Sequence, residues 1–166
     1  MTNLKEIDIY GKEKPEYVFS QALSASAASS ETIGEEDYFG NCVRNYENTI
    51  IAVESRFNTF QGAIRVFTKN EATGKYVQTE RLLASDAAAG DSMGVVTTGL
   101  SIHGGYILAG AAGNDDDGSS AGSAYFFKSS SAGWSQTQKV VASDPAANEN
   151  FGQATALYGN LAVIGA

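Results

Sequence analysis

The sequence contains little cysteine, proline or positive charge, and it lacks a long apolar run. Cys42 is the only cysteine, so the chain can form neither an internal disulfide nor a zinc centre of several thiolates. Eleven basic residues against nineteen acidic ones give a formal net charge of −8, which would repel a nucleic-acid backbone. No stretch approaches the roughly 18 apolar residues of a membrane span, and residues 1–20 lack the apolar core of a signal peptide. We therefore expect no nucleic-acid partner and no membrane span in this segment.

Glycine and aromatic residues, in contrast, are abundant. Eighteen glycines stand among many Ser, Ala, Tyr and Phe residues, with only two prolines. This composition is typical of short strands joined by many turns, and no 3.6-residue apolar stripe indicates a helix. We therefore expect an all-β protein with the length of a single domain.

A repeat runs through the chain. Its anchoring glycines are Gly40, Gly94 and Gly152, which are 54 and 58 residues apart. Further segments match at the same period: "GAIRVF" with "GSAYFF", and "KYVQTERLLASD" with "GWSQTQKVVASD". Residues 16–26, "EYVFSQALSAS", align with the latter pair without gaps. A period of this size is typical of a propeller blade.

Each module contains four β-type runs, which in the second module are residues 95–102, 106–110, 123–128 and 134–142. The run "GSAYFF" is bulky on both faces, because Ala124 and Phe126 point one way while Tyr125 and Phe127 point the other. Both faces must therefore be covered by neighbouring blades. In "YILAGA" the side chains become small toward Gly110, which predicts a close approach of neighbouring backbones.

These residues resemble FG-GAP repeats, the β-propeller blades known from the integrin α-chain head. The resemblance rests on three residue pairs that start the modules: Phe39 and Gly40, Met93 and Gly94, and Phe151 and Gly152. Each pair is followed by a small-residue segment, "IAVES", "LAGAA" or "VIGA", and the last two segments contain Gly110 and Gly165. Met93 replaces the usual Phe, and Val53-Glu54 stands where Gly-Ala is expected. The resemblance implies a partial β-propeller of four-stranded antiparallel blades, covering the chain from Glu16 onward.

The repeat divides the chain into five parts: an N-terminal lead (1–15), the last strand of a preceding blade with a linker (16–36), two blades (37–86 and 87–144), and the first half of a third blade (145–166). Two blades and a half cannot close a ring, which needs about four to eight. We expect a fragment of a longer protein, or several copies assembling into one ring.

One loop of the second module is rich in acidic residues. Asp115, Asp116 and Asp117, with Gly118 for the turn, could form a weak Ca²⁺ site, or simply a solvated turn. The loop lacks the first and last acidic ligands of the calcium-loop pattern. The family's own calcium loops lie between the first two strands of a blade, and "NYENT", "IHGGY" and "YGN" at those places do not match them.

The resemblance also places this loop on the family's ligand-binding face, beside the links between blades. The candidate ligand-face residues are Asp86, Asp91, Asn114, Asp115, Asp116, Asp117, Asp144 and Glu149. A cationic or calcium-bridged partner would suit such a face.

Other side chains have more ordinary explanations. "GSSAG" matches a nucleophile elbow at Ser120, but a strand follows it and the only histidine, His103, precedes it. We expect His103 to be a turn residue, Cys42 a small buried residue, and Trp134 a packing aromatic rather than a sugar platform.

From the residues and the resemblance we expect a non-catalytic scaffold that binds a protein or glycan, in adhesion or recognition outside the cell. Further blades, in the same chain or in other copies, are the other expected partners. Two alternatives stay open: the propeller part of a larger extracellular hydrolase whose active site lies elsewhere, and a purely structural repeat array.

Overall fold

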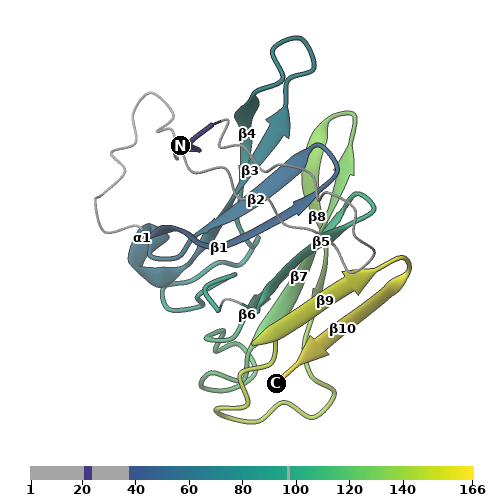
Figure 1. Cartoon of the computed structure of the whole chain (residues 1–166). Coiled ribbons are helices and arrows are strands. Elements are labelled where there is room, and N and C mark those ends of the chain that lie inside the picture. The colour runs from purple at the N-terminus through teal and green to yellow at the C-terminus, as the bar shows by residue number, and fades with distance from the viewer. Residues whose placement is uncertain (1–20, 24–37, 97) are drawn as a thin grey trace, which may run out of the picture.

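The computed structural model describes residues 21–23, 38–96 and 98–166. It shows two four-stranded antiparallel sheets and a two-stranded hairpin lying side by side (Figure 1). The first sheet contains β1 (Phe39–Tyr46), β2 (Thr49–Glu54), β3 (Ala63–Lys69) and β4 (Tyr76–Leu82). The second sheet contains β5 (Leu100–His103), β6 (Tyr106–Ala111), β7 (Ser123–Ser130) and β8 (Gly133–Val140). The C-terminal hairpin contains β9 (Ala154–Tyr158) and β10 (Leu161–Gly165).

Each strand pairs with its neighbour in the sequence, so both sheets are simple meanders with the order β1-β2-β3-β4 and β5-β6-β7-β8. A short turn, α1 (Phe57–Phe60), lies in the link between β2 and β3, and φ is positive at Asn58, Thr59 and Phe60. The fold class expected from the sequence, all-β with four-stranded antiparallel units, is confirmed. The lead (1–15) lies outside the described residues, and so does the segment 16–36 apart from residues 21–23.

The first strand of the second module is shorter than expected. The sequence predicted a strand over residues 95–102, but β5 begins only at Leu100. Backbone hydrogen bonds from Val95 to Ser92 and from Gly99 to Val96 close tight turns there. The prediction was wrong at this end because Val95 and Val96, although apolar, lie half-buried in these turns and not in a strand.

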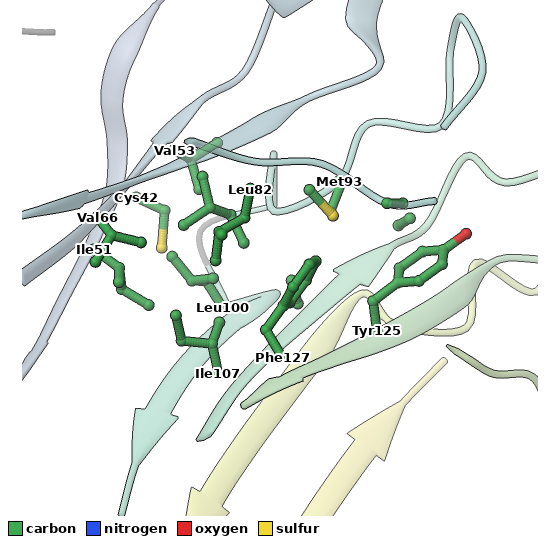
Figure 2. Close-up of a cluster of buried hydrophobic side chains, with 14 residues drawn as sticks. Cys42, Ile51, Val53, Val66, Leu82, Met93, Leu100, Ile107, Tyr125 and Phe127 are labelled. Carbon is green, nitrogen blue, oxygen red and sulfur yellow. The ribbon is translucent and has the colours of Figure 1, made fainter. Parts of the chain in front are cut away.

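The two sheets pack face to face around one hydrophobic core. Its buried members come from both sheets and from the link between them (Figure 2), and they include Cys42, Ile51, Val53, Ile64, Val66, Met93, Leu100, Ile107, Tyr125 and Phe127. Tyr125 and Phe127 thus face the first sheet, whereas Phe126 on the opposite face lies beside Leu157 and Leu161 of the C-terminal hairpin. The expected alternation of β7 is confirmed, and stacking is what buries both of its faces.

A hydrogen bond links the two glycines of the repeat motif. The backbone N–H of Gly94 donates to the carbonyl of Gly110 at 2.7 Å, and in the next module Gly152 donates to Gly165 at 2.9 Å. The two donor glycines also have a positive φ, 72° at Gly94 and 93° at Gly152, which residues other than glycine rarely adopt. The repeat therefore requires glycine at this position for its backbone geometry.

Backbone hydrogen bonds between successive units repeat as well. The N–H of Met93 donates to Gln61 at 2.9 Å, and the N–H of Phe151 donates to Ala121 at the same distance. In both cases the start of one unit is fastened to the loop between the second and third strands of the unit before it. No helix among the described residues is long and apolar enough to cross a membrane.

Candidate ligand-binding face

Three connections at the same end of the sheets carry the acidic residues singled out in the sequence. They are the link from β4 to β5, the loop from β6 to β7, and the link from β8 to β9 (Figure 1). The last two are joined by backbone hydrogen bonds, since Asn148 donates to Ser119 at 2.8 Å and Asn150 donates to Ser120 at 2.9 Å. We call this surface the acidic face; its exposed carboxylates are Asp86, Asp115, Asp116, Asp117, Asp144 and Glu149.

Lys139 of β8 neutralises part of the acidic face. Its Nζ forms ion pairs with Asp86, at 2.8 Å, and with Asp116. Asp86 follows β4 and Asp116 lies between β6 and β7, so the lysine ties the two sheets together at their outer strands. The sequence placed both carboxylates on one face, and the structure brings them to one ammonium group.

The pKa values of this group reflect the pairing. Hydrogen bonds from Lys139 and Asn114 hold the pKa of Asp116 below its usual range. Burial alone would lower the pKa of Lys139, but its hydrogen bonds to Asp116 and Asp86 outweigh burial and raise that pKa. Both side chains are therefore charged over the whole neutral range.

The two remaining acidic residues of the β6–β7 loop are exposed. Asp115 is exposed, and its Oδ1 accepts the backbone N–H of Ser120, which holds the turn closed. Asp117 is also exposed. Asn114 by contrast is only 2% exposed, so it belongs to the support of the loop rather than to its surface.

Buried polar atoms lie behind this loop. Asn114 Oδ1, Ser123 Oγ and the Tyr125 hydroxyl oxygen are buried and accept or donate no hydrogen bond within the described part of the chain. Burial raises the pKa of Tyr125 to about 12, so the hydroxyl keeps its proton. Because these atoms are buried, they lie behind the surface that a partner would contact.

Asp91 and Glu149 occupy equivalent positions in two links and make the same contact. Asp91 Oδ2 accepts the N–H of Ala88 at 2.9 Å, and Glu149 Oε2 accepts the N–H of Ala146 at 3.1 Å. Asp91 is only 4% exposed, whereas Glu149 is exposed. Both carboxylates shape their turn, and Glu149 can in addition face a ligand.

The proposed calcium ligands do not converge on one point. In the ranges 21–23, 38–96 and 98–166, no three His, Cys, Asp or Glu side chains are grouped to hold a metal ion. Asp115 and Asp116 are instead directed to Ser120 and Lys139. Calcium binding stays a prediction, and the geometry gives it no preformed cage.

The ordinary roles expected for three other residues are consistent with their surroundings. Ser120 leads into β7 and not into a helix, so it lacks the context of a nucleophile elbow. Cys42 is buried, and burial raises the pKa of its thiol. Trp134 packs against the core between the sheets, as expected for a packing aromatic.

A stack of three aromatic rings was not anticipated from the sequence. The ring of His103 lies 4.6 Å from that of Tyr46 and 5.2 Å from that of Tyr158, measured between ring centres. The three residues stand at equivalent places beside the first turn of each unit, so the repeat alignment held the signal. The stack joins both sheets and the C-terminal hairpin at one edge.

Two arginines near α1 also lie on aromatic rings. Arg56 lies 4.1 Å from the ring centre of Tyr38 and 5.3 Å from that of Phe60, and Arg81 lies 4.3 Å from that of Phe57. These contacts fix positive charge at the loop between β2 and β3.

Stacked four-stranded meanders, fastened by the same contacts from unit to unit, are blades of a β-propeller-type domain. The chain belongs to the FG-GAP repeat family: the family model matches residues 76–127 and 134–166, together more than half of the chain. No curated protein matches the chain. FG-GAP repeats are generally non-catalytic propeller scaffolding.

Proposed function

We propose that this chain is a non-catalytic propeller scaffold whose acidic face binds a cationic protein or glycan partner. Adhesion or recognition outside the cell is part of this proposal. The observation that carries it is the unequal distribution of charge over the loops. Lys139 pairs with Asp86 and Asp116, while Asp115, Asp117, Asp144 and Glu149 remain exposed on two adjoining connections.

The support of these loops favours a binding role. The loop that carries Asp115 and the link that carries Asp144 are joined by backbone hydrogen bonds, so the backbones of the two connections are held together. A partner therefore meets a preorganised pattern of charge, which reduces the entropy lost on binding.

Binding of an oligolysine peptide, measured by surface plasmon resonance, tests the proposal. The double variant Asp115→Asn with Asp144→Asn should weaken binding roughly tenfold, since each exposed ion pair contributes up to about 1 kcal/mol. Asparagine keeps an oxygen for the N–H of Ser120, so the loop retains its shape. The matched control is Glu71→Gln, an exposed carboxylate in the turn between β3 and β4.

The assay is repeated at about 0.01 M and about 0.15 M salt, where the screening length falls from roughly 30 Å to 8 Å. It is also run with calcium chloride and with EDTA, because a calcium-bridged partner is part of the same hypothesis. Binding that responds neither to salt nor to chelator, or that Glu71→Gln weakens as much as the double variant does, would contradict the proposed function.

A further inference from the structure

One ammonium group of this chain already lies on the acidic face. The Nζ atom of Lys139 is 2.8 Å from Asp86 Oδ2 and forms a second ion pair with Asp116. It also lies 5.7 Å from the ring centre of Tyr125. Carboxylates bind an ammonium group through charge-assisted hydrogen bonds, and an aromatic ring attracts it through its negative face. The two carboxylates and the ring therefore form an ammonium subsite, and its occupant is a side chain of the same chain.

Both four-stranded units contribute to the ammonium subsite. Asp86 lies in the link that leaves β4, Asp116 lies in the loop from β6 to β7, and Lys139 lies on β8. The side-chain amide of Asn114, which is nearly buried, donates to the paired oxygen of Asp116 at 3.4 Å. Because the two units pack around one core, the two carboxylates stay close to each other, and their mutual repulsion favours any ammonium group that reaches them.

The occupant of the subsite can leave it at little cost. β8 is the last strand of its sheet, and the Lys139 side chain is 24% exposed. The side chains of Asp86 and Asp116 are 37% and 56% exposed, so water and a partner can reach them. Ion pairs with this much exposure contribute little stability, and a lysine can place its charge in water while its carbon chain stays on the protein. Lys139 is therefore exchangeable with another ammonium group.

We propose that Lys139 is a tethered competitor on the acidic face: its ammonium group occupies the pair of Asp86 and Asp116 until a lysine side chain of a protein partner replaces it. This inference rests on the proposed function and narrows its partner to a basic protein segment rich in lysine. A lysine fits because the present occupant is itself an ammonium group on a four-carbon chain. Further basic groups of the partner pair with Asp115 and Asp117, the exposed neighbours of Asp116 in the same loop.

Competition of this kind lowers the apparent affinity for the partner in proportion to the fraction of time for which the subsite is free. If Lys139 fills the subsite about nine-tenths of the time, the partner binds about tenfold more weakly than it would to an empty subsite. A purely structural ion pair predicts otherwise, because its removal would loosen the contact between the two units without improving binding. The two interpretations therefore give different results for the same variant.

Oligolysine binding, measured by surface plasmon resonance, tests the competition in the intact chain. Lys139→Met should bind oligolysine about fivefold to tenfold more tightly than the unchanged protein. Lys139→Arg should show no such gain, because its guanidinium group can hold the same two carboxylates. The matched control is Lys128→Met, which removes the same charge from an exposed lysine opposite Tyr106, at the other end of the second sheet.

A second measurement needs no variant. The rate of reductive methylation of Lys139 is followed by mass spectrometry, with and without an oligoarginine peptide that has a blocked N-terminus and so contains no primary amine. Paired with two carboxylates, the ammonium group of Lys139 stays protonated and reacts slowly. Displacement by the peptide should therefore raise its methylation rate several-fold, while the rate of Lys128 stays the same.

Circular dichroism verifies that each variant is folded. Two results overturn the proposal: Lys139→Met that binds oligolysine no more tightly than Lys128→Met does, or a methylation rate of Lys139 that the peptide leaves unchanged or lowers. The proposed function fails separately, since the double variant Asp115→Asn with Asp144→Asn tests whether the face binds oligolysine at all. A comparison of Lys139→Met with Lys128→Met tests only whether the lysine competes.

Discussion

Gly110 and Gly152 bring two backbones into direct contact between the second sheet and the C-terminal hairpin. A Cβ atom on Gly110 would lie 2.7 Å from the Cα of Gly152 and would overlap its carbonyl oxygen. The contact explains why the side chains of β6 become small toward its end. Glycine is therefore required at position 110 because the next unit packs directly against this backbone. At position 152 it is required both for this contact and for the positive φ of the turn.

Gly110→Ala should therefore destabilise the protein. Forcing a methyl group between packed backbones costs about 1–3 kcal/mol or more, because the backbone itself must move. Urea unfolding followed by circular dichroism measures the loss. The control is Gly165→Ala at the equivalent motif position, where a Cβ would lie 3.5 Å from that of Ala154, an ordinary contact. Equal losses in the two variants would contradict the close approach.

Lys139→Met should weaken the contact between the two sheets by about 1 kcal/mol, the range of a partly exposed ion-pair network. The reason is the loss of both ion pairs, to Asp86 and to Asp116. Lys128→Met is the matched control, since Lys128 is exposed and its Nζ lies 5.4 Å from the ring centre of Tyr106. A loss no larger than that of the control would show that Lys139 does not join the sheets.

The contribution of Lys139 should also depend on pH. The pKa of Asp116 is lowered in the folded protein, so its pairing stabilises the fold above the unfolded value of about 3.9 and is lost as the pH falls through the folded value. The pKa of Lys139 is raised, so its contribution is complete below about 10.4 and is lost as the pH rises further. The stability difference between the protein and Lys139→Met should be flat near neutrality and vanish in acid. A difference that persists in strong acid would speak against the ion pair.

Glu54 and Arg65 form a buried ion pair in the first sheet, with two hydrogen bonds of 2.8 and 3.0 Å. Both residues are nearly inaccessible, at 1% and 2% exposure. Glu54→Leu alone should cost about 3–5 kcal/mol, because it leaves the guanidinium buried without its partner. The double variant Glu54→Leu with Arg65→Met should recover most of this loss. Chemical denaturation measures the free energy of unfolding of both variants. An equal loss in the single and the double variant would mean that the two side chains are not coupled.

The sequence predicted the sheets well but not the contacts between them. The repeat placed Gly94 and Gly152 at one motif position, and the structure confirms the same backbone bond at each. Turn chemistry and alternation are local properties, so they are readable along the chain. The pairing of Lys139 with Asp86 depends on the relative position of the two packed sheets, which no local sequence pattern specifies.

The candidate face shows the same limit. Asp115, Asp117 and Asp144 are exposed as expected, but Asp91 is buried and closes a turn. A carboxylate in a loop has the same appearance in a sequence whether it faces solvent or a backbone N–H. Asp91 and Glu149 both stand three residues before a motif glycine, and both accept a backbone N–H within their own link. This shared position in the repeat was the signal in the sequence for a turn-forming carboxylate.

The hydrogen bond from the Trp134 backbone N–H to Glu80 repeats the bond from the Tyr76 N–H to Gln21 one unit earlier, so it tests most directly the claim that successive units are fastened by the same contacts. The measurement is the hydrogen-exchange rate of the Trp134 backbone amide, by NMR, in the protein and in Glu80→Leu. Because Glu80 accepts this N–H at 2.9 Å, we predict slow exchange in the protein and a selective acceleration in the variant, with the amides of β6 unchanged. A Trp134 amide that exchanges as fast as an exposed edge-strand amide, and does not respond to Glu80→Leu, would contradict the account.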